Sequence, residues 1–146
     1  HYLDDKLKLS SILYAMNLIK ILTAEHQSNV KIFSQIENFY NFLNNDKWIK
    51  EFILWELNIL KDPGYHLDFK NYAINSKVNG FDQYVVKNDT ARIIPNFLID
   101  NDQNPKNKGE LIVSLKLVGD FLEKTILKPN NINIPLSRKN FLNLLI

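Results

Sequence analysis

Apolar residues at the start of the chain recur with the period of an α-helix. Between residues 7 and 24 they follow one another at spacings of three and four, which predicts a helix with one buried face. A second stretch of the same kind runs from Val30 to Leu43. The apolar positions are Leu9, Ile12, Leu13, Met16, Ile19 and Leu22 in the first stretch, and Ile32, Phe33, Ile36, Phe39, Tyr40 and Leu43 in the second.

A third predicted helix, from Lys47 to Leu60, is apolar around most of its circumference. Its apolar residues are Trp48, Ile49, Phe52, Ile53, Trp55, Leu57, Ile59 and Leu60. A helix with one face in water does not show this pattern, so we expect a central helix with neighbours on several faces. It ends at Asp62-Pro63-Gly64, because proline disfavours helix at the preceding residue and glycine readily adopts a positive φ.

The pattern then changes to short β-prone pieces between Phe69 and Ile94, separated by Asn79-Gly80 and Asn88-Asp89, which predicts small hairpins. Helical periodicity returns from Gly109 to Leu127 and again in a short helix near the end. We therefore predict a mainly α fold, a helical bundle around a central buried helix with a small β-hairpin insert. Residues 1–68 and 109–146 are expected to form the helical domain, and residues 69–108 the insert and its loop.

The chain of 146 residues has a net charge of only +2, but its basic residues are unevenly placed. From residue 124 to the end there is no acidic residue, and the basic ones are Lys124, Lys128, Arg138 and Lys139. A basic end on a near-neutral body suggests contact with a polyanion. The alternative is a solvated helix end whose cations favour the negative end of the helix dipole.

Few residues offer material for catalysis. Cysteine is absent, and His1, His26 and His66 are too far apart for a metal-binding spacing. No glycine-rich phosphate loop or nucleophile elbow is present, so we expect no enzyme, no metal and no cofactor. The one enzymatic alternative is a hydrolase that uses His66 and Asp68. No stretch is long enough to span a bilayer, and we expect a cytoplasmic protein without membrane contact.

Aromatic residues fall into two groups. Trp48, Phe52 and Trp55 could form a base-stacking platform, but their helical spacing favours core packing. The aromatic residues near or within the predicted hairpins are Tyr65, Tyr72, Phe81 and Tyr84. These four either face solvent or attach the hairpins to the helices, and the sequence leaves both possibilities open.

Two separated segments carry a resemblance to a known family. Residues 55–60 read Trp-Glu-Leu-Asn-Ile-Leu and are followed by Gly64-Tyr65 and Leu67-Asp68-Phe69. This run resembles the central helix of the RecO family of recombination mediators. The later residues 121–129 and Pro135-Leu136-Ser137-Arg138, followed by Phe141, are similar to the end of that family's proteins. The resemblance extends from about Leu7 to Phe141.

The resemblance implies a domain organisation and an insert of a particular kind. Family members open with an oligonucleotide-binding β-barrel, which is missing here, so we expect the chain to be a fragment. Many members also hold zinc through cysteines in the insert, whereas this chain has Ala73 at one such position. The resemblance therefore implies a zinc-knuckle-like but zinc-free insert, held by Tyr72, Ile74, Tyr84 and Val86.

The resemblance further implies binding partners. RecO-like proteins bind single- and double-stranded DNA, join RecR, and bind the acidic, phenylalanine-ended tail of the single-stranded-DNA-binding protein, so a nucleoid-associated location is expected. The basic pair of the family's tail site aligns with Ile53 and Leu54, which leaves Lys47 and Lys50 as the nearest cations. Tyr14, Leu18 and Phe52 are the expected pocket walls. Lys128 and Arg138 match the family's C-terminal pattern for DNA contact, and Lys124 and Lys139 are added on charge.

One alternative belongs to a different class of protein. The matching segments could be coincidental, in which case the chain is a helical protein-interaction domain of an unrelated regulator.

Overall fold

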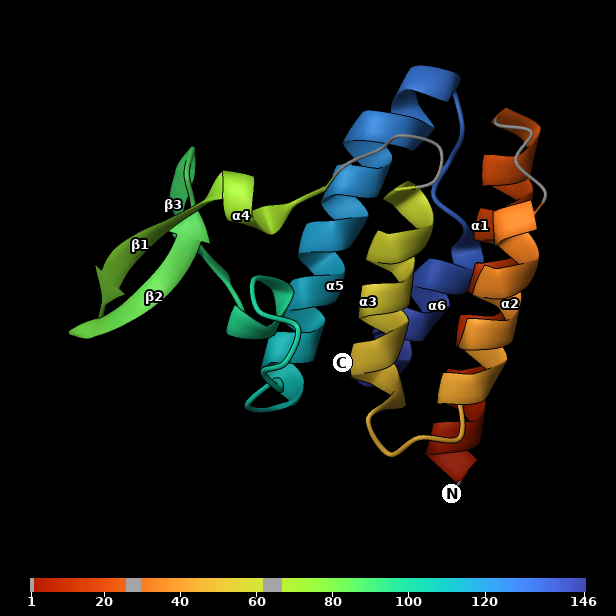
Figure 1. Ribbon diagram of the computed structural model, residues 1–146, viewed down its shortest axis with the longest axis horizontal. Helices are drawn as coiled ribbons and strands as arrows, with labels where there is room; N and C mark the ends of the chain where they lie inside the picture. Colours follow the sequence, from red (N-terminus) through yellow and green to blue (C-terminus); the bar gives the residue numbers. More distant parts are fainter. Residues whose placement is uncertain (1, 26–29, 62–66) are drawn as a thin grey trace.

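The computed structural model describes residues 2–25, 30–61 and 67–146. Within these ranges five longer helices lie side by side as a bundle, and a small sheet projects from one side of it (Figure 1). The helices are α1 (Tyr2–Glu25), α2 (Val30–Phe42), α3 (Trp48–Lys61), α5 (Lys108–Leu122) and α6 (Leu136–Leu145). The predicted mainly α fold is confirmed, and none of the helices in the described ranges has the length and apolar character needed to cross a membrane.

Helix α3 lies at the centre of the bundle, as its pattern predicts. The ring centroid of Phe52 lies 5.9 Å from that of Tyr14 in α1, 6.2 Å from that of Phe39 in α2 and 5.0 Å from that of Phe141 in α6. One side chain of α3 therefore contacts three other helices. Trp48 and Trp55 are also buried, which confirms core packing over a stacking platform.

Helix α1 buries a different face from the one that its sequence predicts. Its buried residues are Leu7, Ser11, Tyr14, Ala15, Leu18 and Leu22, whereas Leu9, Leu13 and Met16 are exposed. Both sets follow helical spacing, so apolar periodicity alone does not choose between them. The hydroxyl of Tyr14 donates a hydrogen bond to the buried carboxylate of Glu56, which explains why the face with the tyrosine turns inward.

Between α3 and α5 the chain forms the insert. A short helix α4 (Phe69–Tyr72) precedes strands β1 (Ala73–Val78), β2 (Phe81–Val86) and β3 (Asp89–Ile94), which pair antiparallel in the order β1-β2-β3. Asn79 and Gly80 join β1 to β2 with φ values of 53° and 83°, the positive values that a tight two-residue hairpin turn requires. A 3-10 turn η1 (Asn96–Leu98) then leads toward α5.

One face of this sheet packs on the bundle. Ile94 belongs to the core, and Ala73, Tyr84 and Val86 pack against it. Register pairs Ala73 with Val86 and Tyr84 with Ile94, so these four residues share one face. Tyr84 and Val86 thus hold the insert as predicted, whereas Tyr72 and Ile74 are exposed and do not.

After α5 the chain loses regular α-helical geometry. Residues Glu123–Leu127 (η2) form a π-helical turn and Lys128–Asn130 (η3) a 3-10 turn, and Asn131 closes them with a φ of 55°. The buried side chains of Ile126 and Leu127 hold this segment to the core. An extended connector then reaches α6, which packs along α1.

Candidate partner-binding groove and basic surface

The outward side of α1 is apolar. Leu9 is 59%, Leu13 50% and Met16 53% exposed, and their spacing places them in one stripe along the helix. Because the opposite side of α1 is buried in the core, the helix is apolar on two faces. Contiguous exposed apolar surface is typical of sites that bind another molecule, which makes this side of α1 a candidate.

Beside this stripe, α1 and α2 enclose a hollow of about 300 Å³, which we call the α1–α2 groove. It is lined by Ile12, Ala15, Met16, Ile19, Lys20, Ile36, Phe39 and Tyr40. Lys20 is exposed and is the one charged side chain among the described residues that line the groove. The α1–α2 groove therefore combines an apolar floor with a cation, which suits a ligand that carries both an apolar side chain and a carboxylate.

Three residues predicted to wall a peptide pocket lie elsewhere. Tyr14, Leu18 and Phe52 have exposed fractions of zero and belong to the core between α1, α3 and their neighbours. Their side chains offer no surface to a ligand, so the prediction that they line a pocket is wrong. The error follows from the inverted orientation of α1, which turns Met16 and Ile19 toward the groove in their place.

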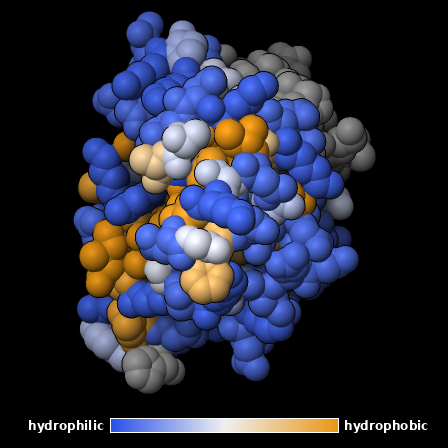
Figure 2. Space-filling model, turned by 90° about the vertical axis from the view of Figure 1, so that its left-hand side faces the viewer, coloured by the Kyte–Doolittle hydropathy of each residue, from blue (hydrophilic) through white to orange (hydrophobic). Residues whose placement is uncertain are grey.

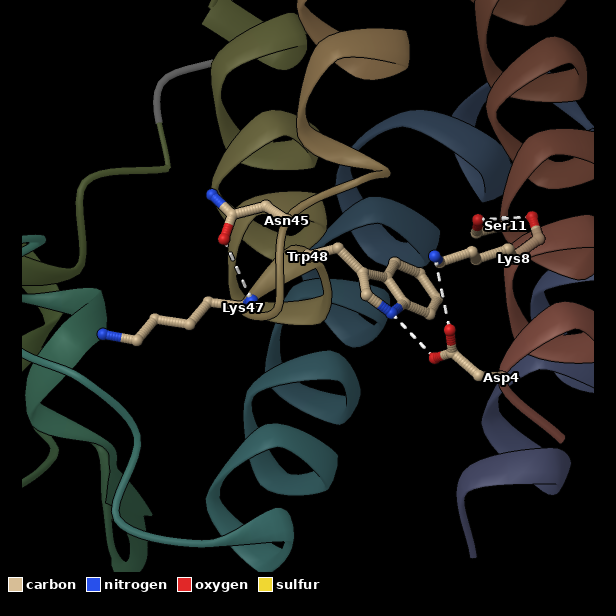
Figure 3. Close-up of polar contacts among 6 residues, drawn as sticks. All are labelled: Asp4, Lys8, Ser11, Asn45, Lys47 and Trp48. Atoms are coloured by element: carbon tan, nitrogen blue, oxygen red, sulfur yellow. Dashed lines mark hydrogen bonds and ion pairs between the residues drawn. The ribbon is translucent and has the colours of Figure 1, made fainter. Parts of the chain in front are cut away.

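The two lysines predicted to accompany that pocket also differ from each other. Lys47 is exposed on the turn before α3 and extends away from α1, whereas the neighbouring Trp48 points toward α1 (Figure 3). Lys50 is buried, and its Nζ donates hydrogen bonds to Asn101 O at 2.8 Å and Asn104 Oδ1 at 3.2 Å. Lys50 therefore fixes the loop before α5 and has little freedom to bind a ligand carboxylate.

Trp48 also shows how α1 is attached to α3. Its Nε1 donates a hydrogen bond to Asp4 Oδ1 at 3.0 Å, and Lys8 Nζ lies 3.3 Å from Asp4 Oδ2 (Figure 3). The hydrogen bond from Trp48, followed by the contact with Lys8, outweighs partial burial and holds the pKa of Asp4 below its usual value.

Arg138 is a structural residue rather than a phosphate contact. Its side chain is 3% exposed, and its Nη2 lies 3.0 Å from Glu56 Oε1 and 2.8 Å from Leu115 O. The prediction that Arg138 binds DNA is therefore wrong, because its guanidinium is enclosed by α3, α5 and α6. Apolar periodicity gives no sign of this pair, and the signal that could have found it is Glu56, a glutamate between the apolar residues Trp55 and Leu57 in the middle of the third helix.

Glu56 joins Tyr14 and Arg138 in a buried polar network. Burial is the main cause that raises the pKa of Glu56, and the positive charge of Arg138 opposes it. Burial also raises the pKa of Tyr14 far above its usual value, so its hydroxyl stays neutral and donates to Glu56. Burial alone would lower the pKa of Arg138, but the carboxylate of Glu56 outweighs it and the pKa is raised.

The other predicted DNA-binding residues are at the surface. Lys124, Lys128 and Lys139 are all exposed, the first two after α5 and the third on α6. Lys128 Nζ lies 3.6 Å from Glu123 Oε1, a solvent-exposed pair that water and salt weaken. All three lysines therefore have the accessibility that a phosphate contact needs, and their role stays a prediction.

Of the two residues of the hydrolase alternative, His66 and Asp68, the structure describes only Asp68. Asp68 caps α4, since its side chain accepts a hydrogen bond from Lys70 N at 3.0 Å, and His66 lies outside the described residues. Within the described ranges, no three histidine, cysteine, aspartate or glutamate side chains come together as a metal site.

Comparisons with known proteins agree on one family. The family described as "Recombination protein O C terminal" matches residues 3–112. A "DNA repair protein RecO" of Rhodospirillum centenum is 21% identical over 154 residues, which cover 95% of this chain and 61% of that relative. Proteins of the same name from two strains of Rickettsia bellii are 29% identical over 76 residues, 52% of this chain and 32% of each relative. No solved structure matches the chain.

Proposed function

The chain belongs to the RecO family of DNA-repair and recombination proteins, in the C-terminal region of that family, and from this premise we propose that it is a recombination mediator. In this role it binds DNA and partner proteins, promotes strand annealing and recombinase loading, and catalyses no reaction. The alternative of an unrelated regulator is set aside, because the family match covers most of the chain.

The observation that carries the proposal is the α1–α2 groove. We assign to it the acidic, phenylalanine-ended tail of the single-stranded-DNA-binding protein. The groove, at about 300 Å³, lies at the small end of the range for ligand pockets, which suits one aromatic side chain. Phe39 and Tyr40 on α2 offer aromatic contacts to that side chain, and Lys20 on α1 offers a cation to its carboxylate.

Binding of a fluorescent tail peptide, followed by anisotropy, tests this assignment. Met16→Asp places a carboxylate in the groove, where it pairs with Lys20 one helical turn away and repels the acidic tail, and should weaken binding roughly tenfold or more. Leu9→Asp is the matched control, since Leu9 is similarly exposed on the same helix but lies outside the groove. Equal affinities of the two variants would remove the groove as the tail site, and no saturable binding by the wild type at low salt would remove tail binding altogether.

DNA binding forms the second part of the proposal. Lys124, Lys128 and Lys139 would neutralise phosphates without reading sequence, which applies to single and double strands alike. An exposed basic end supports this role, and DNA binding would place the protein in the cytoplasm at the nucleoid. RecR is proposed as a further protein partner.

A further inference from the structure

The hairpin of β1 and β2 presents a second face that points away from the bundle. Opposed residues of antiparallel strands share a face, so the register groups residues of β1 and β2 opposite to those that pack on the core. We call this the outer sheet face. Ile74 and Phe81 on it are exposed, Ser76, Val78 and Gln83 are partly exposed, and Val85 is fully buried. Figure 2 views the molecule from the side on which the sheet projects and shows apolar atoms among hydrophilic ones on that side.

Phe81 stands at the exposed tip of this face. Its side chain is 74% exposed, next to the turn of Asn79 and Gly80 and opposite Val78 in the register. At the other end, Lys87 N donates a hydrogen bond to Tyr72 O at 2.8 Å, which places these two residues side by side. Tyr72 is 46% exposed, and Lys87 is exposed as well.

The charged residues near the outer sheet face favour the binding of a polyanion to it. The outer sheet face has no acidic residue, since Asp82 alternates onto the inner side opposite Lys77. Lys70 and Lys87 are exposed, and the structure gives neither an ion pair within its described ranges. The polar pair Ser76 and Gln83 divides the apolar surface, unlike the continuous apolar core of a protein–protein interface.

We propose that the outer sheet face binds single-stranded nucleic acid, with Phe81 and Tyr72 stacking on bases and Lys87 contacting the backbone. Aromatic side chains on an open sheet stack on unpaired bases whatever their sequence, and nearby lysines neutralise the phosphates. Six residues of β-strand separate the two ends, a span of roughly 20 Å, so one strand would cross the sheet over several nucleotides. The inference rests on the DNA-binding part of the proposed function and adds a site to it.

Anisotropy of a labelled oligothymidine with the full chain tests the proposal. Phe81→Ala should weaken binding at least about fivefold, the effect of losing one stacked base. Phe33→Ala is the matched control, because Phe33 on α2 is also 74% exposed and should leave the affinity unchanged. Lys87→Ala should weaken binding and reduce its salt dependence, and duplex DNA should be less affected by Phe81→Ala than the single strand.

A direct readout comes from Phe81→Trp, which keeps an aromatic ring at the tip. Its binding should match the wild type, and its fluorescence should be quenched by the oligonucleotide, whereas Phe33→Trp should show no quenching. Equal affinity of wild type and Phe81→Ala would overturn the site alone, and no binding of any DNA by the wild type at low salt would overturn the DNA-binding function with it. Self-association that Phe81→Ala abolishes would assign the face to a second copy and overturn the proposal.

Discussion

Arg138 in α6 and Glu56 in α3 are 82 residues apart in sequence, and Arg138 Nη2 lies 3.0 Å from Glu56 Oε1 inside the bundle. Both side chains are almost completely buried. The pair connects the last helix to the central one, and Tyr14 extends the connection to α1. The rigidity of the bundle therefore depends on a polar network as well as on apolar packing.

Removing one partner of this pair should destabilise the fold strongly. Arg138→Met leaves the Glu56 carboxylate buried without its cation, which typically costs about 3–5 kcal/mol. Urea unfolding followed by circular dichroism measures the change. Arg92→Met is the control, since the pair of Arg92 with Asp120 is partly exposed and should contribute no more than about 1 kcal/mol. Equal losses in the two variants would contradict the structural role of Arg138.

The same network predicts a pH dependence. The pKa of Glu56 is raised above its ordinary value of 4.5 in the folded state, mainly by burial. The folded protein therefore holds this proton more tightly than the unfolded chain, and the stabilisation that results is present below 4.5 and is lost as the pH rises through the folded pKa. Relative to Glu56→Gln, the wild type should lose free energy of unfolding across that window. Parallel stability curves for the two proteins would count against the raised pKa.

Gly119 leaves the space that the Arg138 guanidinium occupies. A Cβ at Gly119 would lie 3.2 Å from Arg138 Nη2, and Arg138 is held in place by Glu56 and Leu115. Gly119→Ala should therefore destabilise the protein, although alanine favours a helix by about 1 kcal/mol over glycine. In an Arg138→Met background the same change should become stabilising. A stabilising effect in both backgrounds would show that the guanidinium moves freely.

If the exposed lysines of the basic end contact DNA, the affinity for DNA should depend on the salt concentration. Each of Lys124, Lys128 and Lys139 that contacts a phosphate should contribute about 0.7 to the slope of log affinity against log salt for single-stranded DNA. Substitution by alanine should lower the slope by that amount, as measured by anisotropy over a range of salt concentrations. Lys20→Ala should weaken tail-peptide binding and leave the slope unchanged. A slope that none of the three substitutions alters would remove the basic end as a DNA contact.

The sequence predicts the elements well because their signals are local. Helical spacing locates α1, α2, α3, α5 and α6 to within a few residues, except that α1 begins earlier than expected, at Tyr2, and α5 ends earlier than expected, at Leu122. The turn of Asn79 and Gly80 is found because few other residues tolerate a positive φ. The central place of α3 follows from its apolar circumference.

The functional surface is harder to predict because it depends on contacts between distant residues. Helix α1 has two apolar stripes of helical spacing, and the partner of Tyr14 on α3 decides which one is buried. An arginine at the basic end of the chain is expected at the surface. Its ion pair with the buried Glu56, 82 residues away in sequence, shows that Arg138 is buried instead. The family resemblance predicts which partners the chain binds. The position of the α1–α2 groove follows only from how α1 and α2 pack in the folded chain.

Met16 allows a direct measurement of whether the α1–α2 groove binds the partner tail. Met16 lines the groove and is the single methionine of the chain, so labelling its methyl carbon gives one NMR signal from the site. Titration with the tail peptide should shift that signal saturably, with the same dissociation constant as the anisotropy measurement. Saturable peptide binding that leaves the Met16 methyl signal unmoved would place the tail elsewhere on the molecule.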